Sequence, residues 1–233
     1  MKNKIFFALA GLLALFFTAG CQKAEPGLID VTYYPVLTLE GDATLVLDKG
    51  SSYEEPGYTA ILNGEDVSGQ VVVSSNVNMN ASGVYSIGYS IVNKDGFSSS
   101  ASRTVIVLDL NHPVEGLYVT DPQLSYRNYN GITPYGRSFT ILVIDKGDYY
   151  EVDDMLGGWY AQRAGYGSAY AMQGAITVDA DGNVELLDSY VPGWGDSAES
   201  MYDAHFDAAT STFTWGIEYT ANPLNFIVTM TKM

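Results

Sequence analysis

Cysteine is almost absent from this sequence, since Cys21 is the single one among 233 residues. One cysteine excludes an internal disulfide, so the folded chain depends on apolar burial and hydrogen bonds. Histidine is nearly as scarce, with only His112 and His205. One cysteine and two histidines are too few for a zinc cluster of Cys and His, and a Cys-His nucleophile pair is excluded as well. We therefore expect no metal and no other cofactor.

Basic residues are also few, 11 Lys and Arg against 27 Asp and Glu, which gives a net charge of −16. This balance excludes a nucleic-acid partner, because a phosphate-binding surface needs clustered Lys and Arg. No Gly-x-Ser-x-Gly nucleophile turn is present, and the Gly-rich segment at 165–168 lacks the Lys of a phosphate loop. The sequence predicts a protein that is not an enzyme.

The first 21 residues have the pattern of an export signal. Lys2 and Lys4 precede an apolar stretch at 5–17, which is shorter than the ~20 residues of a spanning helix. The following Thr18-Ala19-Gly20-Cys21 resembles a bacterial lipobox, although Thr18 departs from the usual Leu. The resemblance implies a signal peptide over 1–20 and a lipid on Cys21, which would explain the lone cysteine. Residues 21–30 read as a flexible tether.

Short alternating strands fill residues 31–110. Apolar and polar residues alternate at 37–39, 45–47, 71–73 and 84–91, and Asn93-Lys94-Asp95-Gly96 is a hairpin turn signal. About seven such strands suit an immunoglobulin-like sandwich. The segments 53–60 (Tyr-Glu-Glu-Pro-Gly-Tyr-Thr-Ala), 83–97 and 103–107 resemble a bacterial surface immunoglobulin-like domain. Such domains occur in cell-surface lipoproteins of the Bacteroidota and imply a spacer or adhesion module.

Residues 111–233 form a second predicted domain that holds all three Trp and 12 of the 18 Tyr. Strand patterns recur at 116–119, 138–145, 149–152, 175–178, 184–187, 213–215 and 226–231. Gly116-Leu117-Tyr118, the segment 150–154 and the final strand resemble the barrel-like C-terminal domains attached to these lipoproteins. We expect an all-β chain, with the sandwich followed by a lipocalin-like barrel of about eight strands. A second sandwich is the alternative.

Two loops combine aromatic residues with glycine. The first runs from Gly157 to Tyr170 and the second from Tyr190 to Gly195. Aromatic rings on such loops are suited to stacking on the apolar face of a sugar, so we predict ligand contacts by six residues: Trp159, Tyr160, Tyr166, Tyr170, Tyr190 and Trp194. The alternative is that the two Trp fill the barrel core and that glycine lets the backbone bend around them. Arg163 could pair with Asp153 or Asp154, or meet a ligand carboxylate.

Two acidic segments allow other chemistry. Asp153-Asp154 supplies the paired carboxylates of a glycoside hydrolase, but neighbouring strand residues point to opposite faces, which favours solvated charges. The segment 179–185 offers Asp, Asn and Glu to calcium, but its Gly is misplaced for an EF-hand and a hairpin turn is the simpler interpretation. No catalytic and no metal-binding residue is assigned.

Together these features predict a non-catalytic lipoprotein on the outer membrane that binds glycan for a polysaccharide uptake system. Gln22-Lys23-Ala24-Glu25 partly resembles the surface-export tag of the Bacteroidota, in which Lys is followed by acidic residues, so cell-surface exposure is expected and the periplasmic leaflet is the alternative. One rival function is a structural or adhesion role with a surface protein partner. The other is carboxylate-dependent glycoside hydrolysis.

Overall fold

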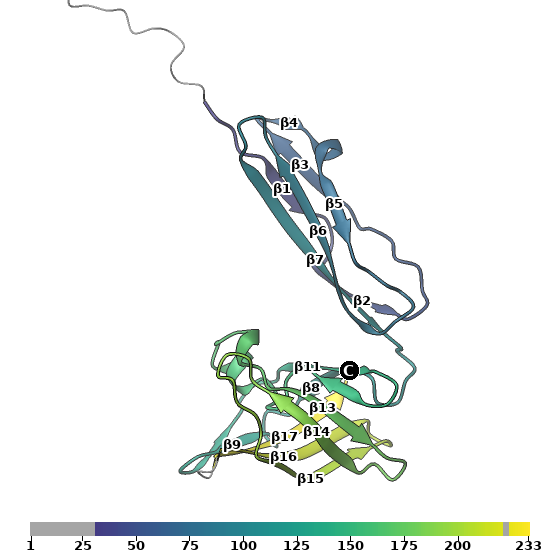
Figure 1. The fold of residues 1–233 in the computed structure, drawn as a ribbon, viewed down its shortest axis with the longest axis vertical. Helices are drawn as coiled ribbons and strands as arrows, with labels where there is room; N and C mark the ends of the chain where they lie inside the picture. Colours follow the sequence, from purple (N-terminus) through teal and green to yellow (C-terminus); the bar gives the residue numbers. More distant parts are fainter. Residues whose placement is uncertain (1–30, 221–223) are drawn as a thin grey trace, which may run out of the picture.

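The described structure, a computed structural model, covers residues 31–220 and 224–233. The predicted signal sequence, the tether and Cys21 lie outside the described residues. The described chain forms seventeen strands and three short helical turns, so the predicted all-β class is confirmed (Figure 1). No helix in this part of the chain is long and apolar enough to cross a membrane.

The first domain is the predicted immunoglobulin-like sandwich. One sheet has the order β1-β3-β4 and the other β2-β7-β6-β5, in which β2 and β7 run parallel. Alternate residues of β6, Ile87, Tyr89 and Ile91, are buried because successive strand side chains point to opposite faces. The elements are β1 Val36–Leu39, β2 Thr44–Asp48, β3 Tyr58–Leu62, β4 Glu65–Asp66, η1 Ser68–Gln70, β5 Val72–Ser75, β6 Gly83–Val92 and β7 Ser98–Leu108.

A buried arginine explains the motif at 53–60. Arg103 of β7 is fully buried and donates to the Glu55 carboxylate at 3.2 Å and to loop carbonyls, while the hydroxyls of Tyr53 and Tyr89 donate to Glu55. Partial burial, the largest single effect, acts to raise the pKa of Glu55, but these hydrogen bonds together lower it. The motif therefore fixes the loop before β3 onto the opposite sheet.

The second domain is a curled sheet with the expected barrel-like form. β8 pairs with both β11 and β17, and the strands from β11 to β17 follow one another in chain order. The elements are β8 Gly116–Thr120, β9 Tyr126–Asn128, β10 Ile132–Pro134, β11 Thr140–Asp145, β12 Tyr150–Val152, η2 Trp159–Arg163, η3 Ser168–Tyr170, β13 Gln173–Val178, β14 Val184–Tyr190, β15 Ser200–Asp207, β16 Thr212–Thr220 and β17 Leu224–Lys232.

Two edge strands of this sheet, β14 and β15, meet at one end only. Asn183 and His205 form an isolated antiparallel bridge, and the Phe206 amide donates to the Gly182 carbonyl at 2.8 Å. Towards the other end of β14 the chain leaves the wall as the loop 191–199. The barrel is therefore closed near the 179–183 turn and opens where the predicted second aromatic loop lies.

The two domains join end to end through a small apolar contact and one buried carboxylate (Figure 1). Leu108 at the end of β7 packs against Leu142 and Ile144 of β11. Glu115, fully buried, accepts hydrogen bonds from the Ser82 hydroxyl of the first domain and from backbone amides on either side of the junction. These contacts set the direction in which the barrel leaves the sandwich.

Candidate functional site

The two predicted aromatic loops meet at the open end of the barrel. Trp194, from the loop after β14, lies 4.7 Å from Tyr160 of η2 and 4.9 Å from Tyr170 of η3, measured between ring centroids. Tyr166 lies 6.3 Å from Trp194 and stacks against Tyr160 at an interplanar angle of 14°. We call Tyr160, Tyr166, Tyr170 and Trp194 the aromatic cluster.

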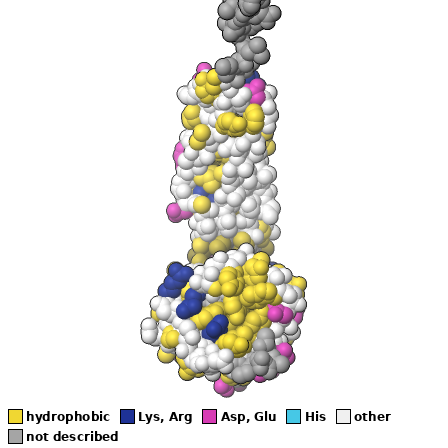
Figure 2. Space-filling view, turned by 90° about the vertical axis from the view of Figure 1, so that its left-hand side faces the viewer, with side chains coloured by type: hydrophobic (Ala, Val, Ile, Leu, Met, Phe, Trp, Pro, Cys, Tyr) yellow, Lys and Arg dark blue, Asp and Glu magenta, His cyan; other side chains and the backbone are white. Residues whose placement is uncertain are grey.

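Part of the aromatic cluster faces solvent. Tyr166 is 56% exposed and Trp194 is 42% exposed, whereas Tyr160 and Tyr170 are partly buried beneath them. On this side of the barrel, apolar side chains form a continuous surface patch with Lys or Arg side chains along its edge (Figure 2). Single exposed aromatics are common on proteins, but a contiguous group of rings is the surface expected for a ligand with an apolar face.

Buried tyrosines connect the aromatic cluster to the barrel core. The Tyr219 ring of β16 lies 6.2 Å from Tyr160, and its hydroxyl donates to the Asp196 carboxylate at 2.7 Å. Burial raises the pKa of Tyr219, and the hydrogen bond to Asp196 raises it further. Burial also raises the pKa of Tyr160, with Arg127 opposing it. Both hydroxyls therefore stay protonated at neutral pH.

Trp159 is not a ligand contact, which corrects the prediction for this residue. Its side chain is only 3% exposed and belongs to the barrel core, edge-on to Tyr135 and Phe226. The Arg163 guanidinium lies 4.1 Å from the Trp159 ring centroid and covers it from outside. The alternative interpretation, a tryptophan filling the core, is therefore correct for Trp159 and wrong for Trp194.

The paired glycines before Trp159 are required by the backbone. Gly157 and Gly158 have φ values of +58° and +86°, and a Cβ on Gly158 would lie 2.6 Å from the Cβ of Phe139. Glycine alone adopts this left-handed conformation readily and leaves room for the phenyl ring. The two glycines therefore turn the chain into η2, which places Trp159 inward and Tyr160 towards the aromatic cluster.

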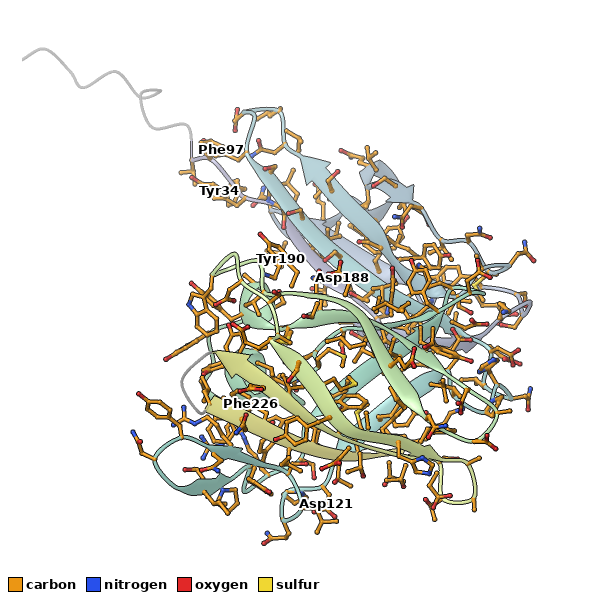
Figure 3. All side chains as sticks on the ribbon, turned by 60° about the horizontal axis from the view of Figure 1, so that its bottom comes forward. Tyr34, Phe97, Asp121, Asp188, Tyr190 and Phe226 are labelled. Carbon is orange, nitrogen blue, oxygen red and sulfur yellow. The ribbon has the colours of Figure 1, made fainter. Side chains whose placement is uncertain are left out.

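Tyr190 lies apart from the aromatic cluster, so the structure does not bring it together with the other predicted ligand contacts. It is 49% exposed and, with Asp188, faces the first domain (Figure 3). There it lines a cleft of about 510 Å³ between the domains, which we call the interdomain cleft. The cleft is also lined by Val84 of the sandwich and by the acidic Glu151 and Asp153 of the barrel wall.

The two adjacent aspartates have different environments. Asp154 is 2% exposed and accepts hydrogen bonds from the backbone amides of Leu156, Gly158 and Met172, so the expectation of a solvated charge is wrong here. Asp153 keeps contact with solvent in the interdomain cleft, although the surrounding protein raises its pKa to about 6. Because the Asp154 oxygens are used internally, the pair does not present two carboxylates to a substrate.

The segment 179–185 forms the predicted hairpin turn. The Asp179 carboxylate accepts hydrogen bonds from the Asp181 amide and from both the backbone and side-chain amides of Asn183. Gly182 has a φ of +83°, as a tight turn between β13 and β14 requires. Among the residues that the structure describes, no group of three or more His, Cys, Asp or Glu is placed to hold a metal ion.

Sequence reasoning missed the residues that support and border the aromatic cluster. Tyr219 and Phe226 lie on strands that the cluster rests on, and Arg127 comes from the hairpin β9–β10, which no alternating pattern predicted. Arg163 pairs with neither Asp153 nor Asp154 in the described part of the chain; its Nε donates to the Tyr135 carbonyl. The scarcity of basic residues was the signal that could have found these arginines, because three of the five Lys and Arg residues of the second domain gather here.

Comparison with known proteins places both domains in families. Residues 37–107 match a family model described as "Bacterial surface protein, Ig-like domain". Residues 108–232, just over half of the chain, match a second family model, which describes a C-terminal domain. No curated protein matches the chain.

Among solved structures, the lipoprotein BT2262 from Bacteroides thetaiotaomicron is 36% identical, with a TM-score of 0.74 over 85% of this chain and 100% of that one. A Clostridium perfringens ZmpB structure with an M60 catalytic domain and two CBM51 domains is 20% identical over 52% of this chain and 14% of that one, with a TM-score of 0.28. That second likeness is too low to bear on function. On the first match and the two family models, the chain belongs to the family of Bacteroidota surface lipoproteins that includes BT2262.

Proposed function

We propose that this protein is a non-catalytic, lipid-anchored surface protein whose aromatic cluster binds glycan for a polysaccharide uptake system. The observation that carries the proposal is the meeting of two Gly-rich loops to form a group of four rings, of which Tyr166 and Trp194 face solvent. A pyranose has an apolar C–H face that packs on such rings. The Asp196 carboxylate beside Tyr219 is available to accept hydrogen bonds from sugar hydroxyls.

The arrangement of the domains supports display. The described chain begins at the end of the sandwich remote from the barrel (Figure 1), so the first domain lies between the proposed anchor at Cys21 and the aromatic cluster. The proposed location is the outer leaflet of the outer membrane, as the partial tag at 22–25 favours. Anchoring would be tested by metabolic labelling with a radioactive fatty acid, which Cys21→Ser should abolish, and exposure by protease accessibility on whole cells.

Glycan binding is tested by affinity electrophoresis of the chain 22–233 in gels containing starch, galactan, polygalacturonate or mucin glycans. We expect retardation by at least one polymer, and a loss of about tenfold or more in affinity in Trp194→Ala and Tyr166→Ala, because each removes an exposed ring at the centre of the site. Tyr190→Ala is the matched control, since it removes an equally exposed ring outside the aromatic cluster. Retention in none of the gels would contradict the proposal and favour a protein partner.

Hydrolysis at the interdomain cleft is the second candidate, favoured by the raised pKa of the exposed Asp153 beside Glu151 and Asp188. Release of new reducing ends from a bound polymer, abolished in Asp153→Asn, would establish it. We expect no release. If Tyr190→Ala lost glycan binding and Trp194→Ala kept it, the ligand site would be the interdomain cleft and not the aromatic cluster.

A further inference from the structure

Three arginines lie on or beside η2, which carries Tyr160 of the aromatic cluster, and we call them the arginine rim. Arg127 of β9 lies 5.1 Å from the Trp159 ring centroid, Arg163 ends η2, and Arg137 precedes β11 and donates to the Gln162 carbonyl at 3.1 Å. They are the only arginines among residues 112–233. The apolar patch in Figure 2 has its positively charged side chains along one edge.

The arginine rim is not neutralised within the described part of the chain. Residues 112–233 contain 16 acidic and 5 basic side chains, so a carboxylate partner is in ample supply. Lys146 takes one, pairing with Glu151 at 3.1 Å. No described carboxylate forms an ion pair with the arginine rim; the guanidiniums instead contact aromatic faces and backbone carbonyls.

One donor of the arginine rim is left unused. The Nε of Arg127 is buried and has no hydrogen-bond partner among the described residues. A buried donor without an acceptor is costly, so it calls for an explanation, of which a bound ion is one. A guanidinium that packs on an aromatic ring and has no carboxylate partner can also bind an anion, because its planar fork fits two oxygens of a carboxylate or sulfate.

We propose that the site is specific for anionic glycan: the aromatic cluster stacks on the sugar ring and the arginine rim binds its carboxylate or sulfate. This inference rests on the proposed function and names its substrate class. The overall negative charge of the domain repels a polyanion elsewhere, so the arginine rim also determines which face such a chain approaches.

Three galactose-based polymers test the inference against the chain 22–233. Polygalacturonate carries carboxylates, carrageenan carries sulfates, and carboxyl-reduced polygalacturonate carries neither. We expect at least tenfold tighter binding of one charged polymer than of the neutral one, and a loss of about tenfold in Arg137→Gln and in Arg163→Gln. Binding of the neutral polymer should fall by less than binding of the charged polymer in both variants. Lys146→Gln is the control for loss of one positive charge elsewhere.

The outcomes separate the two proposals. Equal binding of neutral and charged polymers that depends on Trp194 would overturn the anion inference and leave glycan binding standing. Binding of no glycan would overturn both. If Arg163→Gln lowers the unfolding temperature, Arg137→Gln still tests the inference, because Arg137 is exposed. The polymer that binds tighter identifies the anion as carboxylate or sulfate.

Discussion

A single buried carboxylate joins the two ends of the loop excursion 153–172. Asp154 accepts three backbone hydrogen bonds, from Leu156, Gly158 and Met172, at 3.0 to 3.2 Å. Burial, opposed by these amides, raises its pKa from 3.8 to about 7. The folded protein therefore keeps a proton that the unfolded chain releases as the pH rises from about 4, so the unfolding free energy falls up to about pH 7.

We predict that Asp154→Asn flattens this part of the pH profile. At 1.36 kcal/mol per pKa unit, the fall in unfolding free energy between pH 4 and pH 7 should shrink by about 2 to 4 kcal/mol. This change in slope is separate from any loss of stability that arises because the asparagine amide cannot accept from every backbone group. Urea titrations at pH 4, 5, 6 and 7 measure it. Asp179→Asn is the control, because its hydrogen bonds with Asn183 lower the pKa of Asp179. An unchanged slope in Asp154→Asn would show that the carboxylate is ionised throughout.

At the same scale, the sequence predicts residue types at the site better than their directions. Trp159 and Trp194 both follow glycine, and composition alone does not distinguish them. They differ because Gly157 and Gly158 turn Trp159 into the core beside Phe139, while the loop around Trp194 lies beyond the end of the paired part of β14. Such choices depend on contacts between strands that are distant in the sequence.

At the scale of the element, η2 depends on a close approach between Gly158 and Phe139, the residue before β11. We predict that Gly158→Ala costs about 2 to 4 kcal/mol of unfolding free energy, which combines left-handed backbone strain with overpacking against Phe139. The shift of η2 should also weaken glycan retardation. Chemical unfolding and affinity electrophoresis measure the two effects.

Gly165→Ala is the matched control for that variant. Gly165 has a φ of +75°, close to the +86° of Gly158, but a Cβ there would meet nothing within 4 Å. Its replacement should therefore cost only the backbone strain, about 1 kcal/mol. Equal losses in the two variants would refute the packing argument.

Most strands are predictable because alternation is regular where one face is buried. The predicted segment 184–187 lies within β14 and 226–231 within β17. β15 was not predicted, because its register shifts between Tyr202 and His205 and Asp203 has a φ of +48°, which breaks the two-residue period. The hairpin β9–β10 has only three residues in each strand, too few to show a pattern.

At the scale of the whole molecule, Glu115 holds the barrel to the sandwich. One carboxylate oxygen accepts from the Ser82 hydroxyl at 3.0 Å and the Asp109 amide at 2.8 Å, and the other accepts from the Asp145 amide at 3.1 Å. The apolar contact beside it is small, centred on Leu108, Leu142 and Ile144. Small interfaces between domains permit relative motion unless a specific contact opposes it.

We predict that Glu115→Ala lets the domains reorient, because it leaves three donors at the junction without their acceptor. Small-angle X-ray scattering should show a broader distance distribution with a reduced maximum dimension, and unfolding should divide into two transitions. Ser82→Ala is the control, since it removes only the side-chain hydrogen bond to Glu115 and leaves the amides of Asp109 and Asp145 bound to the carboxylate. If Ser82→Ala alone broadens the distribution as much as Glu115→Ala, the Ser82 hydrogen bond sets the orientation. If neither variant broadens it, the apolar contact around Leu108 holds the domains, and Leu108→Ala becomes the variant that must release them.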